Sequence, residues 1–178
     1  MKWNFLFILL GILSCSAQEI EKQSYKKNLI CTETESKSKQ NDDSILTKTC
    51  TFYNYKLISK GYPDYKGRYS YEYVVFKTVG NRDIKIKNSE LFKNNKELEL
   101  IINKKIKEQY ESDIKIADLK ECMSYIVLRQ YKIDEMGIYF DGNNEMYFSV
   151  NFGLASACFN VSRTLVTLNE SELQRFFK

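Results

Sequence analysis

Four cysteines spread along the chain constrain its fold more than any other feature of the sequence; they are Cys31, Cys50, Cys122 and Cys158. They are even in number, no two have the C-x-x-C spacing, and the chain of 178 residues contains no histidine, so structural disulfides are a better interpretation than a zinc site. The sequence alone leaves the pairing open. Our first expectation joins Cys31 to Cys50, a loop whose closure contributes about 3 kcal/mol in the chain-entropy model, and Cys122 to Cys158.

The N-terminus has the pattern of an export signal. In residues 1–17, Lys2 supplies a positive charge, a mainly apolar run covers 3–13, and small residues follow up to Ala17. An apolar run of about eleven residues is too short to cross ~30 Å of hydrocarbon, which needs ~20 residues. We therefore expect an exported protein, and the oxidising compartment that it enters suits disulfides.

Two routes of signal processing fit these residues. Ile12-Leu13-Ser14-Cys15 resembles the lipobox of bacterial lipoproteins, in which the cysteine is lipidated and becomes the new N-terminus. Lipidation of Cys15 would give a membrane-anchored lipoprotein facing the periplasm, in contact with the membrane only through its lipid. The alternative is ordinary cleavage after Ala17, which would give a periplasmic or secreted protein. Either route removes Cys15 from the disulfide pairing.

Composition divides the rest of the chain into two parts. Residues 18–49 are polar and charged, and such a stretch buries too little apolar surface to offset its ordering entropy, so it is expected to be a tether or loose loop. Residues 50–178 have a suitable length for a single domain. The formal net charge of +4 becomes +3 without Lys2, a mild excess that does not favour nucleic acid as a partner.

Three segments after Cys50 alternate apolar and polar residues with the period of two that half-buried strands have. Turn signals at 61–64, 66–67 and 79–82 separate them, and such short connections favour an antiparallel arrangement. The residues expected to share one face within each strand are Tyr53, Tyr55 and Leu57; then Tyr69, Tyr71, Tyr73 and Val75; then Ile84 and Ile86.

Helical spacing begins beyond this ribbon. An apolar stripe at three- and four-residue spacing predicts a helix from Asn94 or Asn95 to Gln109, and a shorter helix is expected over 117–123. Further strands are predicted over 125–133, 138–140, 146–150 and 164–168, with turns at 134–137 and 141–144 and a terminal helix capped by Asn169 and Glu172. The expected fold class is α+β, a mostly antiparallel sheet with two or three helices packed on one face.

No catalytic constellation is visible in the sequence. Without histidine, the commonest general base is missing, and so is the usual partner of a serine or cysteine nucleophile. Asp134 and Glu135 are adjacent, but they lie in a predicted turn where solvated acids are normal. The run from Asp141 to Glu145 lacks most ligands of a calcium loop, so a turn is the better interpretation. We expect no catalytic residue, no metal site and no cofactor.

Tyrosine is the most informative component of the composition. Tyr69, Tyr71 and Tyr73 on one strand face form a candidate binding surface, because exposed tyrosines can stack on sugars or contact a protein partner. The alternative is that these tyrosines only cover a sheet, since tyrosine has high strand propensity.

Two stretches resemble a family of bacterial envelope domains of unknown function. Ile84–Phe92, running into the predicted helix, looks like the strand, "x-Leu-Phe" turn and amphipathic helix of that family. Tyr131–Phe140 is similar to its late hairpin, and Ser171–Leu173 to its closing helix. The same domain type forms the extracytoplasmic part of lysozyme-sensing anti-sigma factors and accompanies some peptidoglycan deacetylases.

The resemblance covers about residues 70–178 and implies an α+β fold with a non-catalytic, ligand-binding or sensing role. Residues 143–162 depart from the family, since Phe152–Cys158 stands where many members have a stretch with proline and tyrosine. Lysozyme itself fits poorly as a ligand, because a slightly basic domain gains no attraction from a strongly basic partner.

The leading hypothesis is an envelope-anchored binding or interaction module without catalytic activity, whose partner is an envelope protein or a glycan. One alternative is an enzyme that modifies the cell wall with carboxylates. Another is an immunity or inhibitor protein, a common role of small exported domains.

Overall fold

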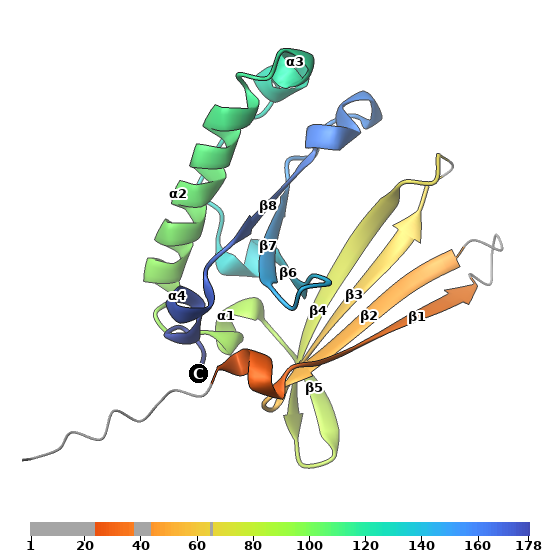
Figure 1. Ribbon diagram of the computed structural model, residues 1–178, viewed down its shortest axis with the longest axis vertical. Helices are drawn as coiled ribbons and strands as arrows, with labels where there is room; N and C mark the ends of the chain where they lie inside the picture. Colours follow the sequence, from red (N-terminus) through yellow and green to blue (C-terminus); the bar gives the residue numbers. More distant parts are fainter. Residues whose placement is uncertain (1–23, 38–43, 65) are drawn as a thin grey trace, which may run out of the picture.

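The computed structural model of the chain describes residues 24–37, 44–64 and 66–178. Its fold class is α+β with two antiparallel sheets, which confirms the expected class and divides the expected sheet in two. The sheets meet near the C-terminus and diverge away from it (Figure 1). The large sheet has the order β1 (Ile30–Lys37), β2 (Ser44–Phe52), β3 (Tyr55–Pro63), β4 (Tyr69–Val79), β5 (Arg82–Ile86), and the small sheet the order β6 (Gly137–Phe140), β7 (Met146–Asn151), β8 (Arg163–Thr167).

The large sheet is a simple meander in which each strand pairs with the next along the chain. The predicted strand that begins at Tyr69 is confirmed as β4, and the turn at 79–82 is confirmed by the positive φ of Gly80. One part of the prediction is wrong: Tyr53 is not in a strand with Tyr55 and Leu57. It has φ of 49° in the tight turn between β2 and β3, because short hairpin turns need positive φ values that alternation of residues does not reveal.

The predicted tether over 18–49 is wrong for its described residues. Residues 25–28 form a short 3-10 helix in which Tyr25 is completely buried, and β1 and most of β2 lie within the segment. The polar composition misled the prediction because β1 is an edge strand whose residues are almost all exposed. The folded domain therefore includes residues from 24 onwards rather than from 50.

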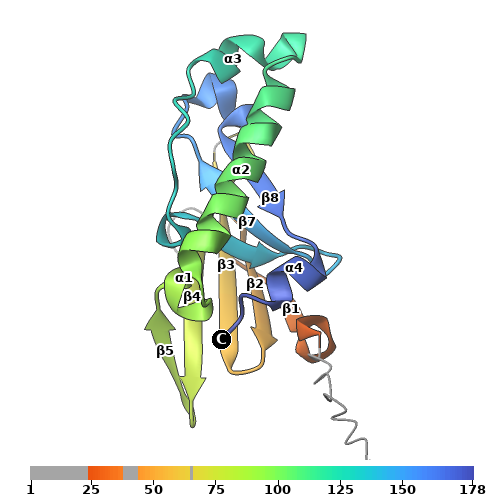
Figure 2. The same ribbon diagram turned by 90° about the vertical axis from the view of Figure 1, so that its left-hand side faces the viewer.

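Helices cover the small sheet on the side away from the large sheet. The helix α2 (Asn95–Asp113) runs along this outer face (Figure 2) and buries Leu98, Ile102 and Ile106. It extends four residues beyond the predicted end at Gln109. The capping box of the terminal helix is confirmed, since the Asn169 side chain accepts from the Glu172 amide. The shorter helices are α1 (Asn88–Leu91), α3 (Lys120–Ser124) and α4 (Glu170–Gln174).

The predicted strand over 125–133 is wrong, although burial alternates over much of this stretch. The buried Asn103 of α2 takes the place of a strand neighbour, since its side chain accepts from the Tyr131 amide and donates to the Tyr131 carbonyl, both at 2.8 Å. The predicted hairpin at 134–137 is also wrong, because residues 133–135 form a 3-10 helix. Burial alternation indicates an extended chain, but it does not say which group satisfies the backbone.

An aromatic cluster joins the two sheets where they meet. Phe52 of β2 lies with its ring centroid 5.4 Å from that of Phe140 of β6 and 5.3 Å from that of Phe177, near the C-terminus. Tyr25 packs against all three rings. Because the four rings come from widely separated parts of the chain, this cluster holds the sheets together at one end.

Both disulfides have the expected pairing. Cys31–Cys50 joins the paired strands β1 and β2 with a Cα–Cα distance of 4.1 Å, and Cys122–Cys158 joins α3 to a 3-10 helix over 156–161 with 5.4 Å. The second disulfide lies in a small separate core with Met123. The predicted signal peptide and the lipidation site Cys15 lie outside the described residues. In the described ranges, no helix is both long and apolar enough to span a membrane.

Candidate functional site

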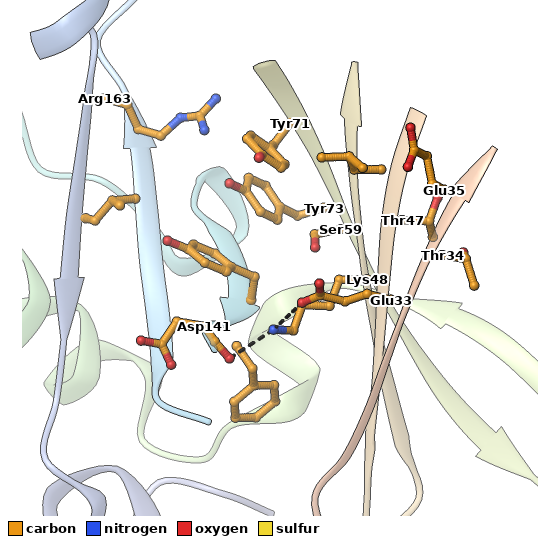
Figure 3. Close-up of a pocket in the computed structure, with 14 residues that line it drawn as sticks. Glu33, Thr34, Glu35, Thr47, Lys48, Ser59, Tyr71, Tyr73, Asp141 and Arg163 are labelled. Atoms are coloured by element: carbon orange, nitrogen blue, oxygen red, sulfur yellow. Dashed lines mark hydrogen bonds and ion pairs between the residues drawn. The ribbon is translucent and has the colours of Figure 1, made fainter. Parts of the chain in front are cut away.

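A cleft of about 520 Å³ opens between the diverging sheets (Figure 3). One wall is the inner face of the large sheet, from β1 to β4, and the other is the inner face of the small sheet. Cross-strand pairing explains why this face becomes polar towards the opening: the buried row with Cys50 and Leu57 is followed by the row with Lys48, Ser59 and Tyr73. The sheets therefore share a dry core at one end and enclose a solvated cleft at the other.

Five tyrosine rings form a row that passes from β4 across to β6 and β7. The row consists of Tyr69, Tyr71, Tyr73, Tyr139 and Tyr147, and successive ring centroids are 6.2, 6.2, 5.5 and 5.7 Å apart. The three predicted tyrosines do share one face of β4, and Tyr71 and Tyr73 line the cleft. Successive rings are neighbours along the row, and Tyr71 remains 39% exposed.

Gly137 makes room for this row. A Cβ atom at Gly137 would lie 2.2 Å from Cδ2 of Tyr73, so the Tyr73 ring rests directly on the β6 backbone. Close approach of a ring to the backbone is a common reason for glycine within a strand. The two sheets can approach at this point only because residue 137 has no side chain.

We expect Gly137→Ala to lower the free energy of unfolding by about 1–3 kcal/mol, because the added methyl group displaces a ring that is held between two others. The control is Gly142→Ala, at a position where an added Cβ meets nothing within 4 Å, and its effect should stay within about 0.5 kcal/mol. Urea unfolding of both variants measures the difference. Equal midpoints for the two variants would contradict this account of the junction.

The hydroxyls of Tyr73 and Tyr139 in the cleft stay protonated well above neutral pH. Burial raises the pKa of Tyr73, an effect that Arg163 and Ser149 oppose. Burial, together with the neighbouring Tyr73 and Tyr147, raises the pKa of Tyr139 to about 12. Both hydroxyls therefore remain available as hydrogen-bond donors at neutral pH.

The raised pKa of Tyr139 predicts a loss of stability at alkaline pH. The folded protein holds this proton more tightly than the unfolded chain, so the contribution is fully present below about pH 10 and is lost as the pH rises towards 12. Between pH 9 and pH 11.5 the free energy of unfolding, measured with urea, should fall in the wild type. This fall should be about 1–2 kcal/mol larger than the fall in Tyr139→Phe. The same pH dependence in both proteins would show that Tyr139 is not the group responsible.

Arg163 is a cation in the cleft that forms no ion pair with the part of the chain that the structure describes. It extends from the start of β8 towards Tyr71, with its guanidinium carbon 5.3 Å from the centre of that ring (Figure 3). Among the residues that the structure describes, no carboxylate lies within ion-pair distance of it. By contrast, Arg129 and Arg175 each pair with a glutamate.

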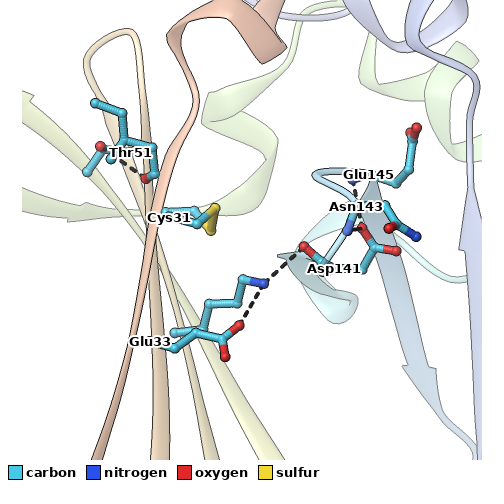
Figure 4. Close-up of a disulfide and its surroundings, with 9 residues drawn as sticks. Cys31, Glu33, Thr51, Asp141, Asn143 and Glu145 are labelled. Carbon is cyan, nitrogen blue, oxygen red and sulfur yellow. Dashed lines mark hydrogen bonds and ion pairs between the residues drawn. A yellow bond between two sulfur atoms is a disulfide. The ribbon is translucent and has the colours of Figure 1, made fainter.

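Lys48 bridges the two walls of the cleft. Its ammonium group pairs with Glu33 of β1 at 2.9 Å and donates to the carbonyl oxygen of Asp141, also at 2.9 Å (Figures 3 and 4). The Asp141 carboxylate turns away from this contact and accepts from the amides of Asn143 and Glu145. These bonds confirm the predicted turn after β6. The ammonium group of Lys48 is already paired with protein groups.

The acidic pair from the sequence has structural roles. Asp134 accepts from the amide and the hydroxyl of Ser89, at 2.7 and 2.9 Å, and thereby holds α1. Glu135 pairs with Arg129, and this contact together with the Lys132 amide lowers the pKa of the Glu135 carboxyl. Within the described part of the chain, no group of three or more acidic or cysteine side chains could hold a metal ion.

Sequence reasoning missed several residues of the cleft. Tyr139 carried a signal, because it alternates with buried apolar neighbours and so faces away from the helices, and Tyr147, its neighbour in the tyrosine row outside the cleft, has the same pattern. No sequence signal marked Arg163 or Lys48 as a cleft residue, since a single basic residue in a polar strand is common. The comparisons add no residue to this list: no protein-family model, no curated protein and no solved structure matches the chain.

Proposed function

We propose that the protein is a binding module of the cell envelope that captures its partner in the cleft and does not transform it. The observation that carries this proposal is the open cleft, whose walls hold Tyr71, Tyr73 and Tyr139 of the tyrosine row and Arg163, which has no carboxylate partner among the described residues. Pockets that combine apolar walls with a few convergent polar groups are the usual sites of ligand binding. The resemblance to envelope domains and the export signal support the same location and the same role.

The candidate carboxylates favour binding over catalysis. Asp134, Glu135 and Asp141 each accept hydrogen bonds that hold a turn or a helix end, so their oxygens are committed to the fold. Tyr73 and Tyr139 have raised pKa values because burial disfavours their ionised form, so neither serves as a base at neutral pH. Replacement of Asp134 and Glu135 together tests the enzymatic alternative, since turnover of wall fragments that disappears with them would overturn a purely binding role.

Site-specific photo-cross-linking of the full chain in its own envelope tests the proposal. A photoreactive residue would replace Leu46 or Leu165, which line the cleft from opposite sheets and are 38% and 43% exposed. The control position is Leu100 on α2, which is exposed outside the cleft. We expect one dominant adduct from both cleft positions that Leu100 does not form. The same adducts at all three positions would contradict a binding role for the cleft.

A further inference from the structure

The charges of the cleft are unevenly placed. Arg163, on the small-sheet wall, is half-buried and has a tyrosine ring as its neighbour in place of a carboxylate. Glu33 and Glu35 are on the opposite wall, in β1 (Figure 3). Lys48 compensates the charge of Glu33, whereas Glu35 has no basic partner among the described residues. A ligand with one anionic group would therefore place it on the β8 side, because Glu35 repels it from the β1 side.

The geometry of the guanidinium group limits which kind of anionic group fits at Arg163. Arginine presents a planar fork of N–H donors that matches the two oxygens of a carboxylate, and such charge-assisted pairs are shorter and stronger than neutral hydrogen bonds. A carboxylate bound to Arg163 would also lie close to Tyr71, whose ring already faces the guanidinium. This part of the cleft is suited to a carboxylate.

Three exposed apolar side chains surround this position. Leu46 of β2, Tyr71 of β4 and Leu165 of β8 line the same cleft and are 38%, 39% and 43% exposed. Large apolar side chains from two sheets that converge on one polar cleft favour an apolar side chain of the ligand. The carboxylate and this apolar group would be neighbours in the ligand.

The remaining wall is polar. Ser59 and the hydroxyl groups of Tyr73 and Tyr139 offer donors and acceptors along the cleft. A hydrocarbon chain would desolvate these groups without hydrogen bonds, which is unfavourable. A peptide backbone can satisfy them. A neutral glycan offers no anionic group to compensate the charge of Arg163.

We propose that the cleft binds the end of an extended peptide, with its terminal carboxylate on Arg163 and the last, apolar side chain between Leu46, Tyr71 and Leu165. This inference rests on the proposed binding function and names its ligand class. The upstream residues of the peptide then run along the hydroxyl groups towards β1. A basic residue there would be attracted by Glu35.

Fluorescently labelled pentapeptides that end in leucine test the assignment, each prepared as the free acid and as the C-terminal amide. Fluorescence anisotropy with the oxidised domain should give roughly ten- to hundredfold tighter binding for the acid, because the amide lacks the charge-assisted contact. Arg163→Gln should abolish this preference, and Arg163→Lys should retain part of it. The matched control is Arg175→Gln, because Arg175 also lies over an aromatic ring, that of Phe176, but on α4's side of the molecule.

Each outcome separates the ligand class from the proposed function. Acid-selective binding that Arg163→Gln removes supports the assignment. Equal binding of acid and amide, or no binding of either, overturns it. Cross-linking from the two cleft positions stays informative in both cases, because a dominant adduct there would preserve the binding role with a different ligand. Loss of selectivity in Arg175→Gln would show that the effect is not specific to the cleft.

Discussion

Replacement of Phe52 by alanine is expected to lower the free energy of unfolding by about 3–5 kcal/mol, the usual cost of removing a buried aromatic side chain. Phe52 is 1% exposed and touches rings from the N-terminal segment, from β6 and from the C-terminus. The cavity left behind would be bounded by rings from three parts of the chain, so it cannot collapse easily. Urea unfolding monitored by far-UV circular dichroism measures this loss of unfolding free energy.

The conservative variant Phe52→Leu is the control for this prediction. It keeps most of the buried volume and should cost less than the alanine variant. Because the cluster joins both sheets, we expect a single unfolding transition for all three proteins. A loss below about 1 kcal/mol in Phe52→Ala would show that the aromatic cluster does not hold the sheets together.

Loss of the Cys122–Cys158 disulfide is the second large effect that we expect. The cysteines are 36 residues apart in sequence, and closing such a loop contributes about 4 kcal/mol in the chain-entropy model. The double variant Cys122→Ala/Cys158→Ala should therefore lose nearly that amount in urea unfolding. It should also speed amide hydrogen exchange in α3, because α3 belongs to the small separate core rather than to the sheet junction.

Removal of the Cys31–Cys50 disulfide is the matched comparison. These cysteines are only 19 residues apart, so closing their loop contributes about 3 kcal/mol to stability in the same model. Exchange should then increase in β1 rather than in α3. If both double variants opened the same region, or if either lost less than about 1 kcal/mol, the disulfides would not act as two independent constraints.

Elements with a local signal were predictable. The alternation that starts at Tyr69 marks β4, and the spacing of Leu98, Ile102 and Ile106 marks α2, because each pattern reports one buried face of a single element. The capping pair Asn169 and Glu172 marks the start of α4 for the same local reason. The α+β class follows from such signals, whereas the disulfide pairing was a first expectation among connectivities that the sequence leaves open.

Elements that depend on distant parts of the chain were not predictable. The polar strand β1 resembles a loop in composition, and only its pairing with β2 and the Cys31–Cys50 bond reveal it. The two sheets approach where Tyr73 lies on Gly137, a contact between residues with no shared local pattern. The strand pattern therefore predicted Tyr71 and Tyr73 of one cleft wall, but it did not predict the second wall with Tyr139 and Arg163.

The central claim is that the cleft is occupied by a ligand in the native envelope. Tyrosine nitration with peptide mass spectrometry tests it most directly, with Tyr71 as the reporter in the cleft and Tyr125 as the reference outside it; they are 39% and 64% exposed. The account predicts that Tyr71 is nitrated less in the envelope than in the purified domain, while Tyr125 reacts equally in both. Equal nitration of Tyr71 in the two settings would contradict the claim.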